Sequence, residues 1–299
     1  MTMKIKYLVV FAFTALIIEG LNAQQEGIFS QYWTMPTVYN PATVGVDGTS
    51  HVALATRRQW SGITDAPTTN FFAYSRAMGK NVGLGLSIIQ DKTFIEKSTF
   101  VSIDFSYKLK FSEDTSLYLG LKGGGNNYSV NTTGLRTYNV IFDPALESFS
   151  RFLPNIGVGL SLHHKRWQLN VSVPRMLNTE RYKNERGRAT QATDRPHFYL
   201  GLTNVFDLSD QIALQPRVLA RIVDGAPSSY DFNTMVIFKE IFNIGGSYRT
   251  DESYAIIAEF NLMEYEDKTL TFGWGYERST RASLADIGET HEFVLRYNF

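Results

Sequence analysis

The residues able to carry out chemistry are few in this 299-residue chain, and their spacing matches no catalytic pattern. His163 and His164 are the only adjacent histidines, but neighbouring side chains on a strand point to opposite faces, so the two cannot easily chelate one metal ion. Gly83-Leu84-Gly85 and Gly123-Gly124-Gly125 lack the strand-to-helix context of a phosphate-binding loop. No spacing singles out a serine and a histidine as nucleophile and base. We therefore expect no enzyme, no metal site and no cofactor.

The composition excludes further classes of function. Lysine plus arginine and aspartate plus glutamate each number 29, so the formal net charge is zero. A neutral chain lacks the basic surface that nucleic-acid binding requires. The chain has no cysteine, which excludes disulfide frameworks, zinc–thiolate sites and iron–sulfur clusters. Aromatic residues make up 14% and charged residues 19%, which is unlike a disordered chain.

Residues 1–23 have the layout of a secretory signal peptide. Lys4 and Lys6 form a short basic region, an apolar run follows over 7–18, and the small residue Ala23 ends the segment. The run is too short for a spanning helix, which needs about twenty residues. An N-terminal anchor or a buried helix is the alternative interpretation. We expect export of the chain and cleavage after Ala23.

From about residue 50 onward, apolar and polar residues alternate, as in β-strands whose two faces differ. Val101, Ile103 and Phe105, for example, alternate with Ser102 and Asp104. A soluble β-sandwich also alternates. Here the polar face is rich in Gly, Ser, Asn, Gln and Arg, which suits a polar lumen, and aromatic residues recur near strand ends, as at the membrane interfaces of a barrel.

The end of the chain also favours a membrane barrel. Phe293, Leu295, Tyr297 and Phe299 share one face of a terminal amphipathic strand, which resembles the closing strand of bacterial outer-membrane barrels. We therefore predict an all-β protein, a transmembrane antiparallel β-barrel of about 14 strands in the outer membrane. The expected strands cover 50–58, 69–77, 81–90, 97–109, 115–128, 155–164, 166–174, 197–206, 211–222, 229–237, 242–249, 253–261, 269–277 and 289–299.

The connections between these strands tend to alternate between long and short. The long ones cover 59–68, 129–154, 175–196 and 278–288. Long loops belong outside the cell and short turns in the periplasm, so the first strand should start, and the last should end, at the periplasmic side. The connection at 250–252 is short for an external loop and 262–268 is long for a periplasmic turn, so the register is least secure there.

Residues 24–49 precede the first expected strand, and the barrel is expected over 50–299. A fourteen-stranded barrel is wider than its wall side chains alone can fill. We expect residues 24–49, with Asn40, Pro41 and Ala42, to enter the lumen as a plug or inner segment. A flexible periplasmic leader is the alternative.

Charged residues on the polar face should form internal salt bridges or line a passage. A Lys or Arg turned towards lipid would cost roughly 2–4 kcal/mol at the membrane midplane, which supports placing them in the lumen. The residues concerned are Asp104, Lys108, Lys122, Arg217, Arg221, Glu259 and Arg296.

A series of short motifs runs through nearly the whole mature chain. It comprises Phe29-Ser30-Gln31-Tyr32, Tyr39-Asn40-Pro41-Ala42, Arg57-Arg58-Gln59-Trp60-Ser61-Gly62, Ala66-Pro67-Thr68-Thr69, Phe142-Asp143-Pro144-Ala145, Phe152-Leu153-Pro154-Asn155-Ile156-Gly157-Val158-Gly159, Val173-Pro174 and the last residues from His291 to Phe299. In this order the set resembles the PorP/SprF family of type IX secretion system outer-membrane proteins. One departure is Gln25-Glu26-Gly27, where the family usually has an Asp-Pro pair, and another is the polar loop 178–196.

The resemblance implies a setting and partners. The family belongs to Bacteroidota, lies in the outer membrane and works with the type IX export and gliding machinery. Members contact periplasmic components of that machinery, or are paired with one secreted adhesin whose C-terminal sorting domain they are thought to engage. The implied role is therefore to dock, export or anchor such a cargo.

The loop 175–196 is a candidate binding site because it is rich in basic residues. Within 175–196, the basic side chains could bind acidic cargo or the phosphates of outer-membrane lipid, although a solvated loop without a specific site is the plainer alternative. The candidates for binding are Arg181, Lys183, Arg186 and Arg188.

Fatty-acid-type transporters also have fourteen strands and a plug with an Asn-Pro-Ala run, so a channel for small or hydrophobic solutes is the competing function. A barrel enzyme is a third.

Overall fold

The computed structural model describes residues 29–133, 148–180, 193–239, 241–250, 253–265, 268–280 and 288–299. The expected signal peptide and its cleavage site lie outside these ranges. Arg181, Lys183, Arg186 and Arg188 of the basic loop lie outside them too. In the described part of the chain, no helix is long and apolar enough to cross a membrane.

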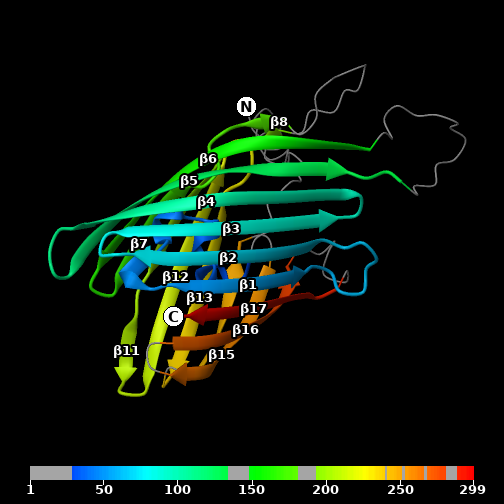
Figure 1. The fold of residues 1–299 in the computed structure, drawn as a ribbon. Helices are drawn as coiled ribbons and strands as arrows, with labels where there is room; N and C mark the ends of the chain where they lie inside the picture. Colours follow the sequence, from blue (N-terminus) through cyan, green and yellow to red (C-terminus); the bar gives the residue numbers. More distant parts are fainter. Residues whose placement is uncertain are drawn as a thin grey trace, which may run out of the picture.

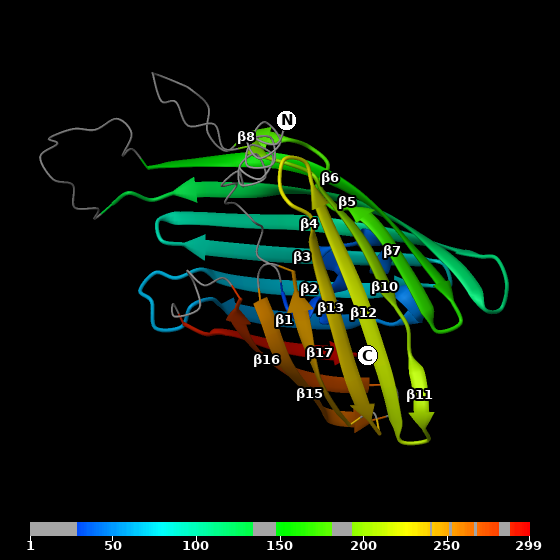
Figure 2. The same cartoon turned by 180° about the vertical axis from the view of Figure 1, so that it is seen from behind.

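Within the described ranges, fourteen antiparallel strands form a closed ring (Figure 1). The strands of the ring are β1 (His51–Arg58), β2 (Thr68–Met78), β3 (Val82–Thr93), β4 (Glu96–Lys110), β5 (Thr115–Val130), β6 (Phe149–His164), β7 (Trp167–Val173), β10 (His197–Thr203), β12 (Ile212–Val223), β13 (Ser229–Phe238), β14 (Phe242–Arg249), β15 (Ser253–Tyr265), β16 (Lys268–Ser279) and β17 (Thr290–Asn298). The first strand pairs with the last, and β10 pairs with both β7 and β12, which closes the sheet (Figure 2). The predicted all-β antiparallel barrel is confirmed. Outside the ring, β8 (Thr179–Glu180) and β9 (Thr193–Asp194) form a separate two-stranded pair.

The two faces of the strands differ as the alternation predicts. On β4, Val101, Ile103 and Phe105 are exposed on the outer surface, whereas Ser102 and Asp104 are buried on the inner one. On β17, Phe293 and Leu295 face outward in the same way. The outer surface is therefore the apolar band that lipid would cover, and the inner surface is mostly small and polar.

One expected strand is divided in two. Instead of covering 197–206, the strand β10 ends at Thr203, and β11 (Phe206–Ser209) is an additional strand that pairs only with β12. Asn204 donates its backbone N–H to the Pro216 carbonyl at 3.2 Å, but a proline nitrogen has no hydrogen to return. The Asn204 side chain accepts the next backbone N–H, that of Val205, at 2.8 Å. The ladder therefore breaks at this position.

Two expected connections are shorter in the structure. β15 extends to Tyr265 and β16 begins at Lys268, because a bulge between Asn261 and Met263 shifts the register and lets pairing continue. The prediction of a long turn over 262–268 was therefore wrong. Similarly, β5 reaches Val130 and β6 begins at Phe149, so 129–154 was too wide a loop. Which end of the barrel faces the periplasm stays a prediction.

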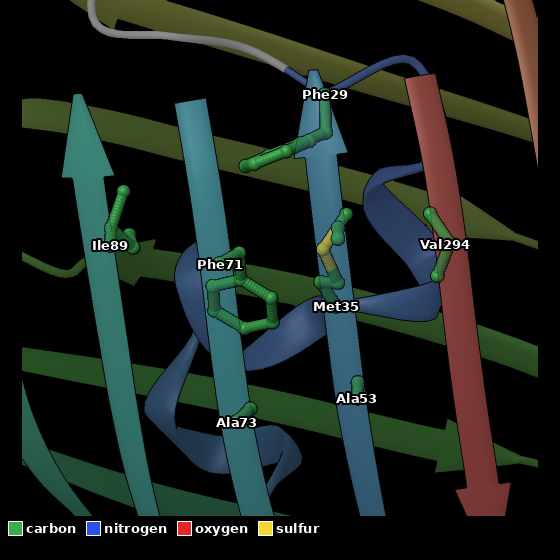
Figure 3. Packing of buried hydrophobic residues seen from close by; sticks show 8 residues of the cluster. Phe29, Met35, Ala53, Phe71, Ala73, Ile89 and Val294 are labelled. Carbon is green, nitrogen blue, oxygen red and sulfur yellow. The ribbon is translucent and has the colours of Figure 1, made fainter. Parts of the chain in front are cut away.

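Residues 29–49, hereafter the N-terminal segment, lie within the ring of strands. They form four short 3-10 helices, η2 (Tyr32–Thr34), η3 (Pro36–Val38), η4 (Pro41–Thr43) and η5 (Val46–Gly48). Phe29 and Met35 are completely buried against the inner wall (Figure 3). Their wall partners are Ala53, Ala55, Phe71, Ala73, Ile89 and Val294. Burying each of these two large side chains stabilises the contact by about 1.5–3 kcal/mol.

Inward-facing glycines let the segment approach the wall closely. A Cβ atom at Gly83 would lie 2.1 Å from the Val44 carbonyl oxygen, and one at Gly120 would lie 2.1 Å from the Ala42 nitrogen. At Gly159, the clash would be with the Asn40 side chain at 2.0 Å. No side chain larger than hydrogen fits at these distances, so the wall glycines serve the close packing of backbone on backbone.

Replacing Gly120 by alanine should dislodge the N-terminal segment, because the added methyl meets backbone atoms that cannot move aside. We expect a loss of about 1–3 kcal/mol in the free energy of unfolding, measured in urea with the barrel in lipid vesicles. Gly123→Ala on the same strand is the matched control, since a Cβ there meets nothing within 4 Å. Equal stability of the two variants would contradict the assignment.

Candidate functional site

The inner wall carries a buried group of five charged side chains, hereafter the luminal ion cluster. It consists of Arg57, Asp231, Arg249, Glu277 and Glu292, which come from β1, β13, β14, β16 and β17. Arg57 Nη2 lies 2.8 Å from Glu277 Oε1, and Arg57 Nη1 lies 3.4 Å from Glu292 Oε2. Arg249 pairs with Asp231 at 2.8 Å and with Glu277 at 3.8 Å.

Strand register brings these charges together. Arg57 stands directly opposite Glu292 across the β1–β17 seam, and Asp231 stands directly opposite Arg249. Opposite charges at such facing positions attract at short range. Alternation alone does not reveal this cluster as a unit, although it places Glu292 on the polar face of the last strand. The signal that could have found it is an arginine at an inward position of the first strand.

The N-terminal segment is fastened to this cluster. The backbone N–H groups of Ser30 and Gln31 donate to the two carboxylate oxygens of Glu292, each at 2.8 Å. The Ser30 hydroxyl donates to Glu277 at 2.5 Å and accepts from Arg57 at 3.3 Å. A buried carboxylate is stable only when its charge and its lone pairs are satisfied. Glu292 therefore requires both the arginine and the segment.

A second ion pair holds the middle of the segment. Lys122 Nζ lies 2.8 Å from Asp104 Oδ1 and donates to the Thr37 carbonyl at 3.0 Å. Both charged side chains are buried, and this pair confirms the expected salt bridge inside the barrel. Lys108, by contrast, lies with its ammonium 5.3 Å from the ring centre of Tyr118.

Asn40, Pro41 and Ala42 link the segment to the opposite wall. The Asn40 side chain accepts from the Ala42 N–H at 2.9 Å, which caps η4, and Pro41 occupies the first position of that helix. The Asn40 amide also donates to the Leu160 carbonyl on β6 at 2.9 Å and to Asn170 on β7 at 3.1 Å. The motif thus combines a helix cap with two hydrogen bonds to the wall.

A cavity of about 290 Å³ remains between the N-terminal segment and the wall. Its aromatic lining consists of Tyr32, Trp33, Tyr39 and Tyr199, and its cationic lining consists of Arg217 and Arg296. Burial is the main cause that raises the pKa of Tyr32 and of Tyr39 above the usual value, so both hydroxyls stay neutral at physiological pH.

The histidine pair behaves as its strand position predicts. His163 is half-buried, lines the cavity and shares a hydrogen bond with Ser161 at 2.9 Å, whereas His164 is exposed and shares one with Thr115 at 2.8 Å. Among the residues that the structure describes, no three His, Asp or Glu side chains are grouped so that they could hold a metal ion.

A closed antiparallel barrel with an apolar outer surface and a polar interior defines the class of outer-membrane β-barrel proteins. The sequence model of the family described as "Type IX secretion system membrane protein PorP/SprF" matches residues 21–297. The chain therefore belongs to the PorP/SprF family. This membership makes it an outer-membrane component of type IX secretion and confirms the resemblance read from the motifs. No curated protein matches the chain.

The chain is similar to several solved structures, and those with a TM-score above 0.5 share its fold. A FadL homologue from Pseudomonas aeruginosa is 10% identical with a TM-score of 0.51, over 87% of this chain and 92% of that one. The CymD monoaromatic hydrocarbon channel is also 10% identical with a TM-score of 0.51, over 91% and 92% of the two chains. The Omp33 outer-membrane protein of Acinetobacter baumannii is 9% identical with a TM-score of 0.46, over 84% and 98%.

Replacing Glu292 by glutamine should release the N-terminal segment from the seam. A neutral amide loses the pairing with Arg57 and leaves one of the two backbone N–H groups without an acceptor, which we expect to cost about 3–5 kcal/mol. The readout is maleimide labelling of a Thr37→Cys background, because the chain has no other cysteine and Thr37 is buried.

We expect labelling to be slow with Glu292 present and fast in the Glu292→Gln variant. The matched control is Glu113→Gln, which removes a carboxylate that pairs with Lys110 at an exposed turn. Fast labelling in both variants, or in neither, would show that Glu292 does not hold the segment.

Proposed function

We propose that this protein is a plugged docking platform of the type IX secretion machinery. It docks, exports or anchors a secreted, adhesin-like surface protein through the C-terminal sorting domain of that cargo. Membership of the PorP/SprF family supports the setting. The observation that carries the docking role is the fastening of the N-terminal segment to the seam between the first and last strands through Glu292.

A filled lumen favours docking over free passage. The segment is held by the luminal ion cluster at one side, by the Asp104–Lys122 pair in the middle and by Asn40 at the other side. Opening a passage would break buried charge-assisted contacts at several places at once, and breaking each of them costs free energy. A rigid, closed body suits a protein that presents loops to a partner.

The partners of this function are proposed accordingly. They are the cargo, the periplasmic components of the machinery and the lipid of the outer membrane. Arg181, Lys183, Arg186 and Arg188 remain our candidates for binding acidic cargo or lipid phosphates from the loop between β7 and β10. We propose no enzymatic role, and the signal peptide with cleavage after Ala23 remains the proposed route to export.

The competing function is a channel for small or hydrophobic solutes. It is favoured by the cavity beside the segment. The two functions differ in what they require of the lumen, because a channel needs a path and a docking platform does not.

Deleting the protein should remove one adhesin-like cargo from the cell surface while other type IX cargo remains exported. Mass spectrometry of surface-shaved proteins measures this directly. If every cargo stayed attached and only the uptake of a solute fell, the docking proposal would be wrong.

The basic loop can be tested in the same cells. Changing all four basic candidates to glutamine should reduce surface cargo without lowering the amount of folded barrel, since no strand of the described ring includes these positions. The control changes Lys110 and Arg166, exposed cations at the opposite, short-turn end, to glutamine and should leave the cargo unchanged.

Purified protein in planar bilayers should conduct little current, whereas a variant without residues 24–49 should conduct strongly, because the segment fills the lumen. An equally high conductance of both proteins would favour the channel.

A further inference from the structure

The cavity beside the N-terminal segment has an unusual charge arrangement. Arg217 is buried and Arg296 is partly buried, and among the described residues neither forms an ion pair. Arg217 donates to Asn233 at 3.1 Å and to Gln215, and its guanidinium lies 4.2 Å from the ring centre of Trp33. All of these partners are neutral. A guanidinium is always charged at physiological pH, so burial without a carboxylate is costly.

Arg296 is bound in the same manner. It donates to Asn298 at 2.9 Å, to the Thr34 carbonyl at 3.3 Å and to His51 at 3.3 Å. These acceptors are neutral as well. Both arginines thus have donors and charge in excess of what the protein itself satisfies.

One carboxylate acts on both arginines from a distance. Glu259 attracts the two guanidinium groups through space. Its oxygens, however, accept from the Trp33 indole at 2.7 Å and from Asn243 at 3.0 Å. Glu259 does not line the cavity, and the described residues of the lining include the two arginines and no carboxylate, so positive charge is in excess there.

Two residues of the cavity lining each have a buried polar atom that lacks a partner within the described chain. Tyr32 and His51 both line it and are both buried, and within the described chain Tyr32 Oη and His51 Nε2 have no hydrogen-bond partner. Arginine can only donate, so the contact from Arg296 makes His51 Nδ1 an acceptor. A neutral imidazole then carries its hydrogen on Nε2. The unpartnered atoms are therefore an N–H donor and a phenol hydroxyl, which also donates.

The remaining lining is aromatic and polar without charge. Trp33, Tyr39 and Tyr199 supply flat apolar surface, and Tyr39 packs against Tyr199 with ring centres 5.3 Å apart. The volume of about 290 Å³ lies at the lower end of the range for small-molecule sites. His163 and Gln168, which flank the short turn between β6 and β7, place the cavity towards the short-turn end of the barrel.

We propose that this cavity binds a small organic carboxylate with a flat or apolar body. The carboxylate would supply negative charge to a lining that has none and accept from the arginine fork, for which its geometry is well matched. The aromatic rings would cover the body of the ligand. A neutral hydrocarbon would leave the positive charge of the arginines uncompensated, and inorganic phosphate would bring no apolar body to the aromatic rings. Binding at this cavity does not depend on cargo docking, so this proposal is independent of the docking function proposed above.

Calorimetric titration of the purified full barrel tests this directly. The probes are 3-phenylpropionate, its neutral amide 3-phenylpropanamide, and acetate. We expect 3-phenylpropionate to bind at least about tenfold more tightly than the amide, which lacks the charge, and than acetate, which lacks the body. Arg217→Gln and Arg296→Gln should each weaken the binding of 3-phenylpropionate at least about tenfold.

The matched control is Arg166→Gln, which removes an exposed arginine at the same end of the barrel and should bind as the unaltered protein does. The comparison of acid, amide and acetate uses unaltered protein, so it decides the matter even where an arginine variant fails to fold. No heat of binding at millimolar 3-phenylpropionate would overturn the proposal. So would equal affinities for acid and amide or for acid and acetate, or unchanged affinity in both arginine variants.

Discussion

The interior of this barrel depends on the contacts that the Glu292 carboxylate makes with Arg57 and with the N-terminal segment. It lies on the last strand, faces Arg57 on the first strand, and accepts two successive backbone N–H groups from the N-terminal segment. One buried side chain therefore joins three distant parts of the chain. Since such a carboxylate is stable only with its charge and lone pairs satisfied, the closure of the ring and the position of the segment are energetically coupled.

Small residues complement this electrostatic fastening. The wall glycines at 83, 120 and 159 bring the backbone of the segment into direct contact with the strands, while the large side chains Phe29 and Met35 fill the remaining space at the β1–β3 wall. The interior is thus divided between a packed region and a cavity rich in donors. The packed region suits a rigid support for external loops. The cavity is lined by two arginines that the packing of the interior does not require.

Most of the wall could be predicted from the sequence, because a period of two assigns each residue of a strand to a face. Asp104 and Lys122 were placed in the lumen in this way, and they pair there. Local exceptions could not be predicted: the break at Asn204 depends on Pro216 lying opposite, and the bulge near Met263 depends on pairing with β16. The luminal ion cluster and the cavity were also missed as units. The cluster depends on the register between neighbouring strands, and the cavity depends on the path of the segment, neither of which alternation encodes.

The contacts of Ser30 have a consequence for biogenesis. Its partner Glu292 is 262 residues further along the chain, so this binding site for the N-terminal segment does not exist until the last strand is in place. Because the loop-closure entropy of so distant a contact must be overcome before the contact stabilises the fold, the segment depends on the closed ring for this anchor. A barrel that lacked its last strand, or paired it wrongly, would leave Ser30 and Gln31 without the carboxylate that accepts from them.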